Sequence, residues 1–241
     1  MNHPTTKQAL ITGASSGIGK ATALAFAAEG INLALVSRES ENLEAVAAAA
    51  RAVGVKAEAY PLDLAKIEQV QSSISAIAAQ LGAVDILVNS AGMGYTGSLT
   101  ETSLTDWQSV LDLNLTSVWQ CILGVLPSMR DRRSGIIINV SSIAGTQTFP
   151  NWGAYCVSKF GLMALSKTLA AEERAHGIRV TAICPGSVNT PMWDTDTVDA
   201  DFDRSAMLTP EIVAQSILHA VQLPASAVIE EITLMSNAGV L

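Results

Sequence analysis

Residues 9–19, with the sequence ALITGASSGIG, decide the fold of this chain. An apolar run typical of a strand ends in a glycine-rich turn, and a helical pattern follows directly. Glycines permit a tight turn and let the backbone approach a pyrophosphate, and a helix N-terminus offers free N–H groups to that anion. A plain strand-to-helix turn is the alternative, but the position after the first strand favours binding. The segment predicts a dinucleotide site that includes Gly13, Ser15, Ser16, Gly17, Ile18 and Gly19.

Strand-like and helix-like patterns alternate along the rest of the chain. Several strands are uninterrupted apolar runs, which are typical of strands buried on both faces of a parallel sheet. The expected strands are Ala9–Ile11, Asn32–Val36, Lys56–Tyr60, Ile86–Val88, Gly135–Val140, Val180–Ile183 and Ile229–Leu234. The expected helices are Gly17–Glu29, Glu41–Val53, Lys66–Leu81, Ser103–Met129, Gly153–Ala175 and Pro210–Val221. The alternation predicts an α/β fold, a doubly wound parallel (Rossmann) sheet of about seven strands with helices on both faces, in a single domain over residues 1–241.

The composition excludes several function classes. The 241 residues are 49% hydrophobic and 15% charged, which excludes a disordered chain. The net charge of −8 offers no basic surface to nucleic acid. No apolar run approaches the roughly 18 residues of a membrane span, and the opening residues MNHPTTKQALITG do not resemble a signal peptide. We therefore expect partners other than nucleic acid or membrane.

The cysteines and histidines give no pattern of metal ligands. The three cysteines, Cys121, Cys156 and Cys184, are not spaced like metal ligands, and an odd number cannot all pair in disulfides within one chain. Reduced thiols in a cytoplasmic protein are therefore expected. The three histidines are scattered, at positions 3, 176 and 219. We expect no metal site.

The end of the second expected strand bears on the choice of cofactor. In dinucleotide folds an acid about 20 residues beyond the turn binds the ribose 2′-hydroxyl, and that count from Gly17 reaches Ser37, followed by Arg38. A carboxylate there would repel a 2′-phosphate, whereas a guanidinium binds it through two hydrogen bonds. Ser37 and Arg38 predict NADP(H) rather than NAD(H). The alternative is a surface arginine paired to Glu39 or Glu41.

Six motifs follow one another in the order of a known family. They are TGASSGIG at 12–19, NSAG at 89–92, Asn114, NVSS at 139–142, YCVSK at 155–159 and PG at 185–186. By these motifs the chain resembles the short-chain dehydrogenase/reductase family from end to end. The resemblance implies an oxidoreductase that moves a hydride between NADP(H) and a carbonyl or alcohol carbon.

The expected catalytic residues are Asn114, Ser142, Tyr155 and Lys159. Tyr155 and Lys159 lie one turn apart on an expected helix and face the same side, and a nearby ammonium lowers a phenol pKa from about 10 toward a useful range. Ser142 follows a buried strand, where its hydroxyl can hydrogen-bond a substrate oxygen. In the family that serine lies thirteen positions before the tyrosine, which selects Ser142 over Ser141. Turn, cap or surface roles are the alternative.

The family resemblance assigns further roles. Asn114, locally unfavourable in a helix, would hold a water in a proton relay with Lys159, which also reaches the nicotinamide ribose. Asp63 and Leu64 would meet the adenine, although Asp63 reads equally well as a helix N-terminal acid. The residues expected to pass close to the cofactor or face the nicotinamide are Asn89, Ala91, Gly92, Pro185, Gly186, Val188 and Thr190.

Residues 191–209 are polar, acid-rich and too long for a tight turn, so a substrate-binding loop or lid is expected there. An apolar pocket for a small or medium substrate is expected from Thr148, Trp152, Met192 and Trp193, with plain packing as the alternative. The helices expected over residues 103–129 and 153–175 carry surplus apolar side chains, which predicts a homodimer or homotetramer.

Three functions remain open. The first is an NADPH-dependent carbonyl reductase, reversible as an alcohol dehydrogenase, acting on a small-molecule ketone, aldehyde or alcohol. The second is a 3-oxoacyl-carrier-protein reductase, whose acidic carrier would dock on arginines 130, 132, 133 and 174, although the net charge of −8 argues against it. The third is a non-catalytic NADP(H) sensor or scaffold on the same fold.

Overall fold

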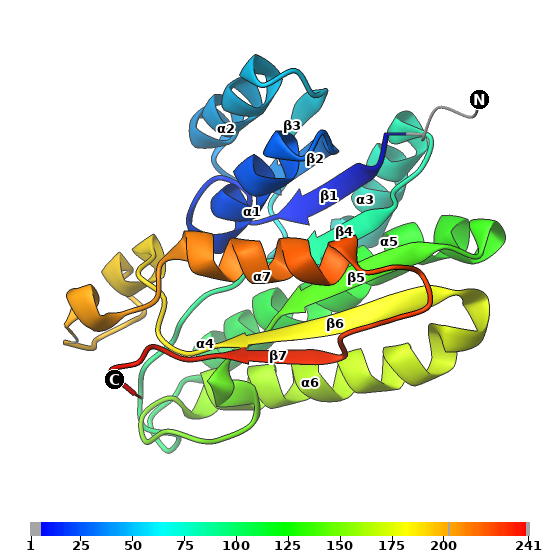
Figure 1. Ribbon diagram of the computed structural model, residues 1–241. Helices are drawn as coiled ribbons and strands as arrows, with labels where there is room; N and C mark the ends of the chain where they lie inside the picture. The colour runs from blue at the N-terminus through cyan, green and yellow to red at the C-terminus, as the bar shows by residue number, and fades with distance from the viewer. Residues whose placement is uncertain (1–5, 202, 240–241) are drawn as a thin grey trace, which may run out of the picture.

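A parallel sheet confirms the predicted fold class. The computed structural model describes residues 6–201 and 203–239, and these contain seven strands, all paired in parallel, in the order β3-β2-β1-β4-β5-β6-β7 (Figure 1). The strands are β1 Gln8–Thr12, β2 Asn32–Ser37, β3 Ala57–Pro61, β4 Ile86–Asn89, β5 Gly135–Val140, β6 Ile178–Pro185 and β7 Glu231–Leu234. Residues 1–5 of the segment screened for a signal peptide, and residue 202 of the expected lid, lie outside the described residues.

Helices cover both faces of the sheet, as predicted. They are α1 Gly17–Ala28, α2 Ser40–Ala52, α3 Ile67–Leu81, α4 Leu104–Leu111, α5 Ser117–Arg132, α6 Gly153–Glu173 and α7 Pro210–Gln222. One apolar core joins α1, α2 and α7 to the sheet, and a second joins α3, α5 and α6 to the opposite face (Figure 1). The site therefore stands on a sheet that is fixed from both sides.

Neighbouring residues of the central strands enter opposite cores. Leu10 belongs to the core beneath α3 and α5, whereas Ile11 belongs to the core beneath α1 and α7, and both are fully buried. In β5, Ile137 and Ile138 divide in the same way. This burial on both faces is why the strands read as continuous apolar runs rather than as an alternation.

The helix predicted over residues 103–129 is interrupted in its middle. A π-helical turn, Asp112–Thr116, separates α4 from α5. The prediction of one regular helix was wrong there because Asn114, at the centre of the turn, is engaged in hydrogen bonds to other parts of the chain. Such π-helical turns are frequent at functional sites.

The whole helical stretch Leu104–Arg132 has 29 residues and is, by length and composition alone, apolar enough to cross a membrane. This differs from the expectation based on uninterrupted apolar runs, since an average over a window tolerates polar residues. Half of its most apolar window is buried. Val118, Ile122 and Val125 pack into the core beneath the sheet, so its apolar character is that of a core helix.

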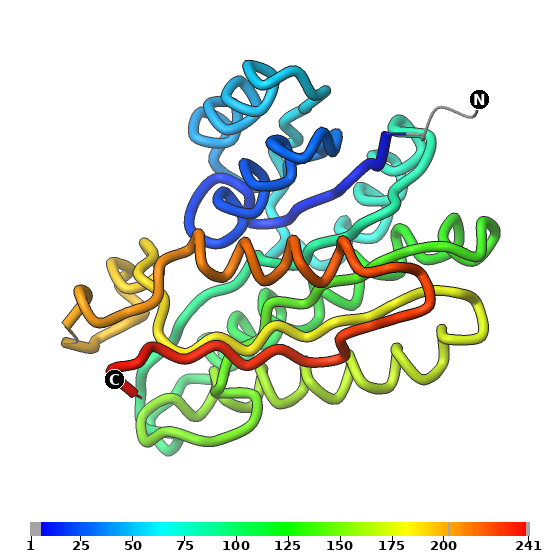
Figure 2. The backbone as a smooth tube through the Cα atoms, in the orientation of Figure 1, coloured from blue at the N-terminus to red at the C-terminus, as the bar shows by residue number. Residues whose placement is uncertain are grey.

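The carboxyl ends of the strands meet at one edge of the sheet. β1 and β4 are neighbours there, with the strand order running away from them on both sides, which is where open α/β sheets bind ligands. Figure 2 shows the segment after β6, coloured gold, leaving the sheet at this edge. We call residues 191–209 the lid.

Two glycines allow backbone to contact backbone at this edge. Gly13 has φ +66°, and a Cβ there would lie 2.8 Å from backbone atoms of Ala91, in the loop after β4. A Cβ on Gly19, inside α1, would overlap the carbonyl oxygen of Gly13. The glycine-rich turn is therefore packed against itself and against the neighbouring loop.

Gly19→Ala is expected to lower the free energy of unfolding by about 1–3 kcal/mol, because the new methyl group meets backbone that has no room to move. An alanine inside a helix is otherwise favoured over glycine by about 1 kcal/mol. A decrease in the free energy of unfolding therefore indicates the close contact, whereas an increase would be expected without it. Urea unfolding measures the change. Lys20→Ala, at an exposed position of the same helix, is the control and should change stability by less than about 0.5 kcal/mol. A Gly19→Ala protein as stable as the wild type would contradict the close contact.

Candidate active site

A cavity of about 300 Å³ opens at the carboxyl edge of the sheet. Its walls come from the loops that follow β1, β2, β3, β4, β5 and β6, together with α6. The predicted cofactor residues that line it are Gly13, Ser15, Ser16, Gly17, Ile18, Ser37, Arg38, Leu64, Ala91, Gly92, Tyr155, Lys159, Pro185, Gly186, Val188 and Thr190. The structure thus joins the glycine-rich turn to the Tyr155–Lys159 segment through one space.

Three residues predicted to bind the cofactor do not line this cavity. Gly19 lies beneath the turn, against Gly13. Asp63 Oδ1 accepts a hydrogen bond from Ala65 N at 3.1 Å in the turn before α3, which fits the alternative role of an acid preceding a helix. Asn89 is buried, and its Nδ2 donates to Asn139 Oδ1 at 2.9 Å. These residues shape the loops behind the wall.

The first turn of α1 has backbone donors available for an anion. Ser16 is the N-cap residue, but its side chain makes no capping hydrogen bond. The N–H groups of the turn therefore remain for a ligand at the positive end of the helix. Beside it, the Ser15 and Ser37 hydroxyls lie 2.8 Å apart, which links the glycine-rich turn to the end of β2.

Arg38 is exposed at the cavity wall, next to Ser37. Glu39, one of the partners considered from sequence, instead accepts a hydrogen bond from Asn42 Nδ2 at 2.7 Å. Within residues 6–201 and 203–239, no ion pair involves Arg38. The guanidinium is therefore free to bind an anion in the cavity.

Tyr155, Lys159 and Ser142 meet at the end of β5. Tyr155 and Lys159 lie in the first two turns of α6 and are both buried. Lys159 Nζ donates a hydrogen bond to the Val140 carbonyl at 3.0 Å and lies 5.6 Å from the centre of the Tyr155 ring. The Ser142 hydroxyl accepts a hydrogen bond from Ala144 N at 3.1 Å and lies near enough to the Tyr155 phenol to act on its pKa. Two hydroxyls and one ammonium thus converge where β5 opens into the cavity.

The pKa of Tyr155 is shifted opposite to the expected direction. Burial, the largest effect, raises the pKa of Tyr155 to about 12, although the hydrogen bond with Ser142 acts to lower it. Burial also lowers the pKa of Lys159 from 10.5 to about 8. The predicted lowering of the phenol pKa by the ammonium is wrong for the protein groups alone, because desolvation disfavours the charged form of both side chains.

Asn114 connects the loop after β4 to α6. Its Oδ1 accepts from Met93 N at 2.8 Å, and its Nδ2 donates to the Met93 carbonyl at 2.9 Å and to Ser158 Oγ at 3.1 Å. Ser158 precedes Lys159, and a Cβ on Gly92 would lie 3.1 Å from Asn114 Oδ1 and 3.8 Å from Lys159 Nζ. The π-helical turn therefore holds the amide beside the lysine. Sequence reasoning identified Asn114 but missed its hydrogen bonds to Met93 and Ser158.

A smaller pocket of about 90 Å³ adjoins the large cavity. Three of the four predicted substrate residues, Trp152, Met192 and Trp193, line it. Thr148 does not; it is exposed, and its neighbour Phe149 lines the pocket instead. A large apolar residue in a polar turn was the signal that sequence reasoning overlooked. Among the described residues, no group of three or more His, Cys, Asp or Glu side chains is suited to a metal ion.

The rings in this pocket contact one another edge to face. Trp152 lies 5.4 Å from Tyr155 and 5.8 Å from Trp193, measured between ring centres. The pocket wall therefore continues directly from the reactive phenol to the lid.

The buried ammonium predicts a stability difference that depends on pH. Because the folded pKa of Lys159, about 8, lies below its unfolded value of 10.5, the folded chain releases this proton first, and its destabilising effect fades as pH rises above 8. Relative to Lys159→Met, the free energy of unfolding of the wild type should increase by about 2 kcal/mol between pH 7 and pH 9.5.

Urea unfolding of both proteins at both pH values measures this difference. Lys167→Met, on the same helix but with an exposed side chain, is the control, and its difference from the wild type should change much less with pH. A Lys159→Met difference that is independent of pH would contradict the burial of a protonated lysine.

Comparison with known proteins agrees with this geometry. The family model described as short chain dehydrogenase matches residues 7–201. A 3-oxoacyl-[acyl-carrier-protein] reductase of Staphylococcus epidermidis is 40% identical over 187 residues, which is 77% of each chain. Its counterpart from Thermotoga maritima is 35% identical over 88% of this chain and 89% of that protein. Glycine betaine reductase ATRR of Emericella nidulans is 36% identical over 94% of this chain, but the chain spans only 18% of that protein.

Solved structures give the same result. An alcohol dehydrogenase from Thermococcus sibiricus, complexed with 5-hydroxy-NADP, has a TM-score of 0.88 at 30% identity, covering 96% of this chain and 97% of that one. Acetoin dehydrogenase YohF from Salmonella typhimurium has a TM-score of 0.87 at 28% identity, covering 98% and 96%. The chain therefore belongs to the short-chain dehydrogenase/reductase family and is an oxidoreductase that uses a nicotinamide cofactor.

Proposed function

We propose that the protein transfers a hydride between NADP(H) and the carbonyl or alcohol carbon of a small or medium apolar ketone, aldehyde or alcohol. One observation carries the proposal. The large cavity and the small apolar pocket share Ser142, Tyr155, Gly186 and Met192 in their walls. A cofactor in the first and a substrate in the second would therefore meet at the two hydroxyls.

The cavity fits a dinucleotide on its own geometry. The backbone cradle at Gly13 and Gly19 has no room for a Cβ, and the uncapped start of α1 leaves N–H groups for a pyrophosphate. Arg38 and Ser37 would hold a 2′-phosphate, and Lys159 would bind the nicotinamide ribose. The bound nicotinamide supplies the hydride, and the protein supplies position and charge.

In the reducing direction, the Ser142 hydroxyl donates a hydrogen bond to the substrate carbonyl oxygen and orients it. The Tyr155 phenol donates its proton to that oxygen as negative charge develops. The Lys159 ammonium stabilises the phenolate that remains, and the amide of Asn114 fixes the loop and helix around the lysine. The pKa of Tyr155, about 12, keeps the phenol protonated at neutral pH and so suited to act as an acid.

The second candidate is a 3-oxoacyl-carrier-protein reductase, which the names of the relatives at 35–40% identity favour. The arginines considered for docking an acidic carrier argue against it. Three are already paired with carboxylates, in the pairs Arg130–Glu173, Arg132–Asp85 and Arg174–Glu230. They also lie just before β5 and β6 begin, at the edge of the sheet opposite the cavity. These arginines therefore give no support for a carrier docked at the mouth of the cavity.

A homo-oligomer in the cytoplasm is part of the same proposal. Trp119 on α5 and Phe160 on α6 are 45% and 42% exposed, which supports an interface on these helices. The described cysteines are free thiols, as in a reducing compartment. A non-catalytic sensor on this fold would not need the two hydroxyls and the ammonium to converge. Measuring turnover together with NADPH binding distinguishes such a sensor from an enzyme.

Tyr155→Phe is expected to lower turnover by about 10²–10⁴-fold, because it removes the proton donor but keeps the ring. Loss of NADPH absorbance with a panel of ketones measures turnover, and titration should show NADPH affinity changed by less than about threefold. Tyr60→Phe, whose phenol binds Glu58 away from the cavity, is the control. If the wild-type protein binds NADPH tightly but turns over no carbonyl compound, the sensor is favoured. If the wild-type protein turns over only acyl thioesters, the carrier-protein reductase is favoured.

Arg38→Ala is expected to lower the ratio of NADPH to NADH efficiency by about tenfold or more, because a charge-assisted hydrogen bond to the 2′-phosphate is lost. Efficiency with NADH should change little. Kinetics with both cofactors measure the ratio, and Arg51→Ala, an arginine paired with Glu44, is the control. An unchanged preference would refute the assignment of Arg38.

A further inference from the structure

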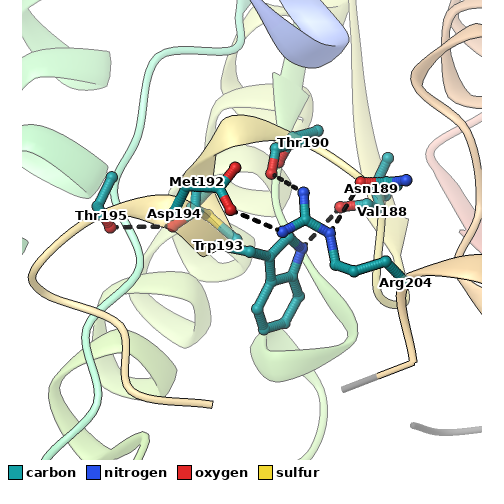
Figure 3. Close-up of polar contacts among 8 residues, drawn as sticks. All are labelled: Val188, Asn189, Thr190, Met192, Trp193, Asp194, Thr195 and Arg204. Atoms are coloured by element: carbon teal, nitrogen blue, oxygen red, sulfur yellow. Dashed lines mark hydrogen bonds and ion pairs between the residues drawn. The ribbon is translucent and has the colours of Figure 1, made fainter. Parts of the chain in front are cut away.

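One arginine of the lid is bound on three sides. Arg204 Nε donates to Asn189 Oδ1 at 2.8 Å, Nη1 to Asp194 Oδ1 at 3.0 Å and Nη2 to the Thr190 carbonyl at 3.0 Å (Figure 3). The planar guanidinium has donors in fixed directions, so three acceptors around it are held relative to one another. The Arg204–Asp194 ion pair is partly exposed and is a weak constraint by itself. The geometry of the Arg204 guanidinium therefore matters more than its charge.

The three acceptors lie on the segments of chain that form the walls of both cavities. Asn189 and Thr190 lie in the segment that faces the large cavity, where Val188 and Thr190 line the wall. Asp194 directly follows Trp193, which lines the small pocket. The Trp193 indole also donates to the Val188 carbonyl at 2.8 Å, as Figure 3 shows. Arg204 and the indole thus join the same two stretches of chain.

The backbone of Arg204 is itself anchored. Asp203 Oδ1 accepts from Ser205 N at 2.9 Å and caps the short turn that begins at Arg204. Further on, Leu208 N donates to the Ser187 carbonyl and Asn189 N donates to the Leu208 carbonyl, both at 2.9 Å. These bonds pair the end of the lid with the segment that leaves β6. The backbone at Arg204 is therefore held in place, and from there the guanidinium contacts the turn that carries Trp193.

We propose that Arg204 is a positioning residue that holds Trp193 against Trp152 in the wall of the small pocket and thereby sets the size of carbonyl substrate that the pocket accepts. This inference rests on the proposed function. Without the guanidinium, the turn Pro191–Asp194 loses the ion pair of Asp194 and its link through Arg204 to Asn189. The indole bond to the Val188 carbonyl is then left to hold Trp193, and the Trp193 wall can move outward. The pocket then holds a small substrate less firmly and admits a larger one.

Arg204→Gln should raise the KM of a small apolar ketone about tenfold, with kcat changed less than about threefold. The ratio of kcat/KM for a bulky ketone to that for the small one should rise about tenfold. Arg204→Lys should behave like Arg204→Gln, because lysine keeps the positive charge but lacks the planar set of donors of the guanidinium. Arg174→Gln removes an exposed ion pair at the opposite edge and should leave both values unchanged. Rescue by lysine, or an equal loss of kcat for both ketones, would overturn the proposal.

Acrylamide quenching of tryptophan fluorescence tests the same idea without turnover. Arg204→Gln should increase quenching, and the increase should disappear when Trp193→Phe is added to both proteins. Unchanged quenching in Arg204→Gln would overturn the positioning role even if the enzyme reduces ketones. Increased quenching that depends on Trp193, in a protein that reduces no carbonyl, would support the positioning of Trp193 and overturn only the proposed function.

Discussion

The hydrogen bond from the Lys159 ammonium to the Val140 carbonyl is the interaction on which the site depends. It attaches the first turns of α6 to the carboxyl end of β5. Tyr155 lies one turn before the lysine, and Ser142 lies two residues beyond the carbonyl, so this bond fixes all three groups together. The ammonium is almost completely buried, and its lowered pKa records the unfavourable desolvation that the surrounding core offsets. A charge in such a place is typical of a functional site rather than a stabilising feature.

Burial also decides which protonation states the site holds. Near neutral pH, a lysine with a pKa of about 8 remains mostly protonated, and a tyrosine with a pKa of about 12 remains a phenol. The phenol is thus ready to donate a proton, as reduction of a carbonyl requires, whereas the reverse step requires the phenolate. The ammonium acts on the charge that appears during the step, not on the resting phenol.

Much of the fold and of the site was readable from the sequence because the signals are local. Apolar runs marked the strands, glycine spacing marked the turn after β1, and the Tyr155–Lys159 spacing placed both side chains on one side of α6. The features that escaped prediction arise from contacts between distant segments. The π-helical turn at Asn114 depends on contacts with Met93 and Ser158, and the raised pKa of Tyr155 depends on burial. The path of the loop before α6 decides that Phe149, rather than Thr148, lines the small pocket.

The lid is fixed by the same kind of distant contact, at positions that are separate from the reactive groups. Thr197 Oγ1 donates to the Gly94 carbonyl at 2.8 Å, and Thr96 N donates to the Thr197 carbonyl at 2.9 Å. The lid is therefore bound to the loop after β4 as well as to the segment after β6. Because neither attachment passes through Tyr155 or Lys159, the lid sequence can change the pocket while the proton donor and its lysine keep their positions. We therefore infer that the shape of the lid, rather than the reactive cluster, sets the selectivity between substrates of the proposed reaction.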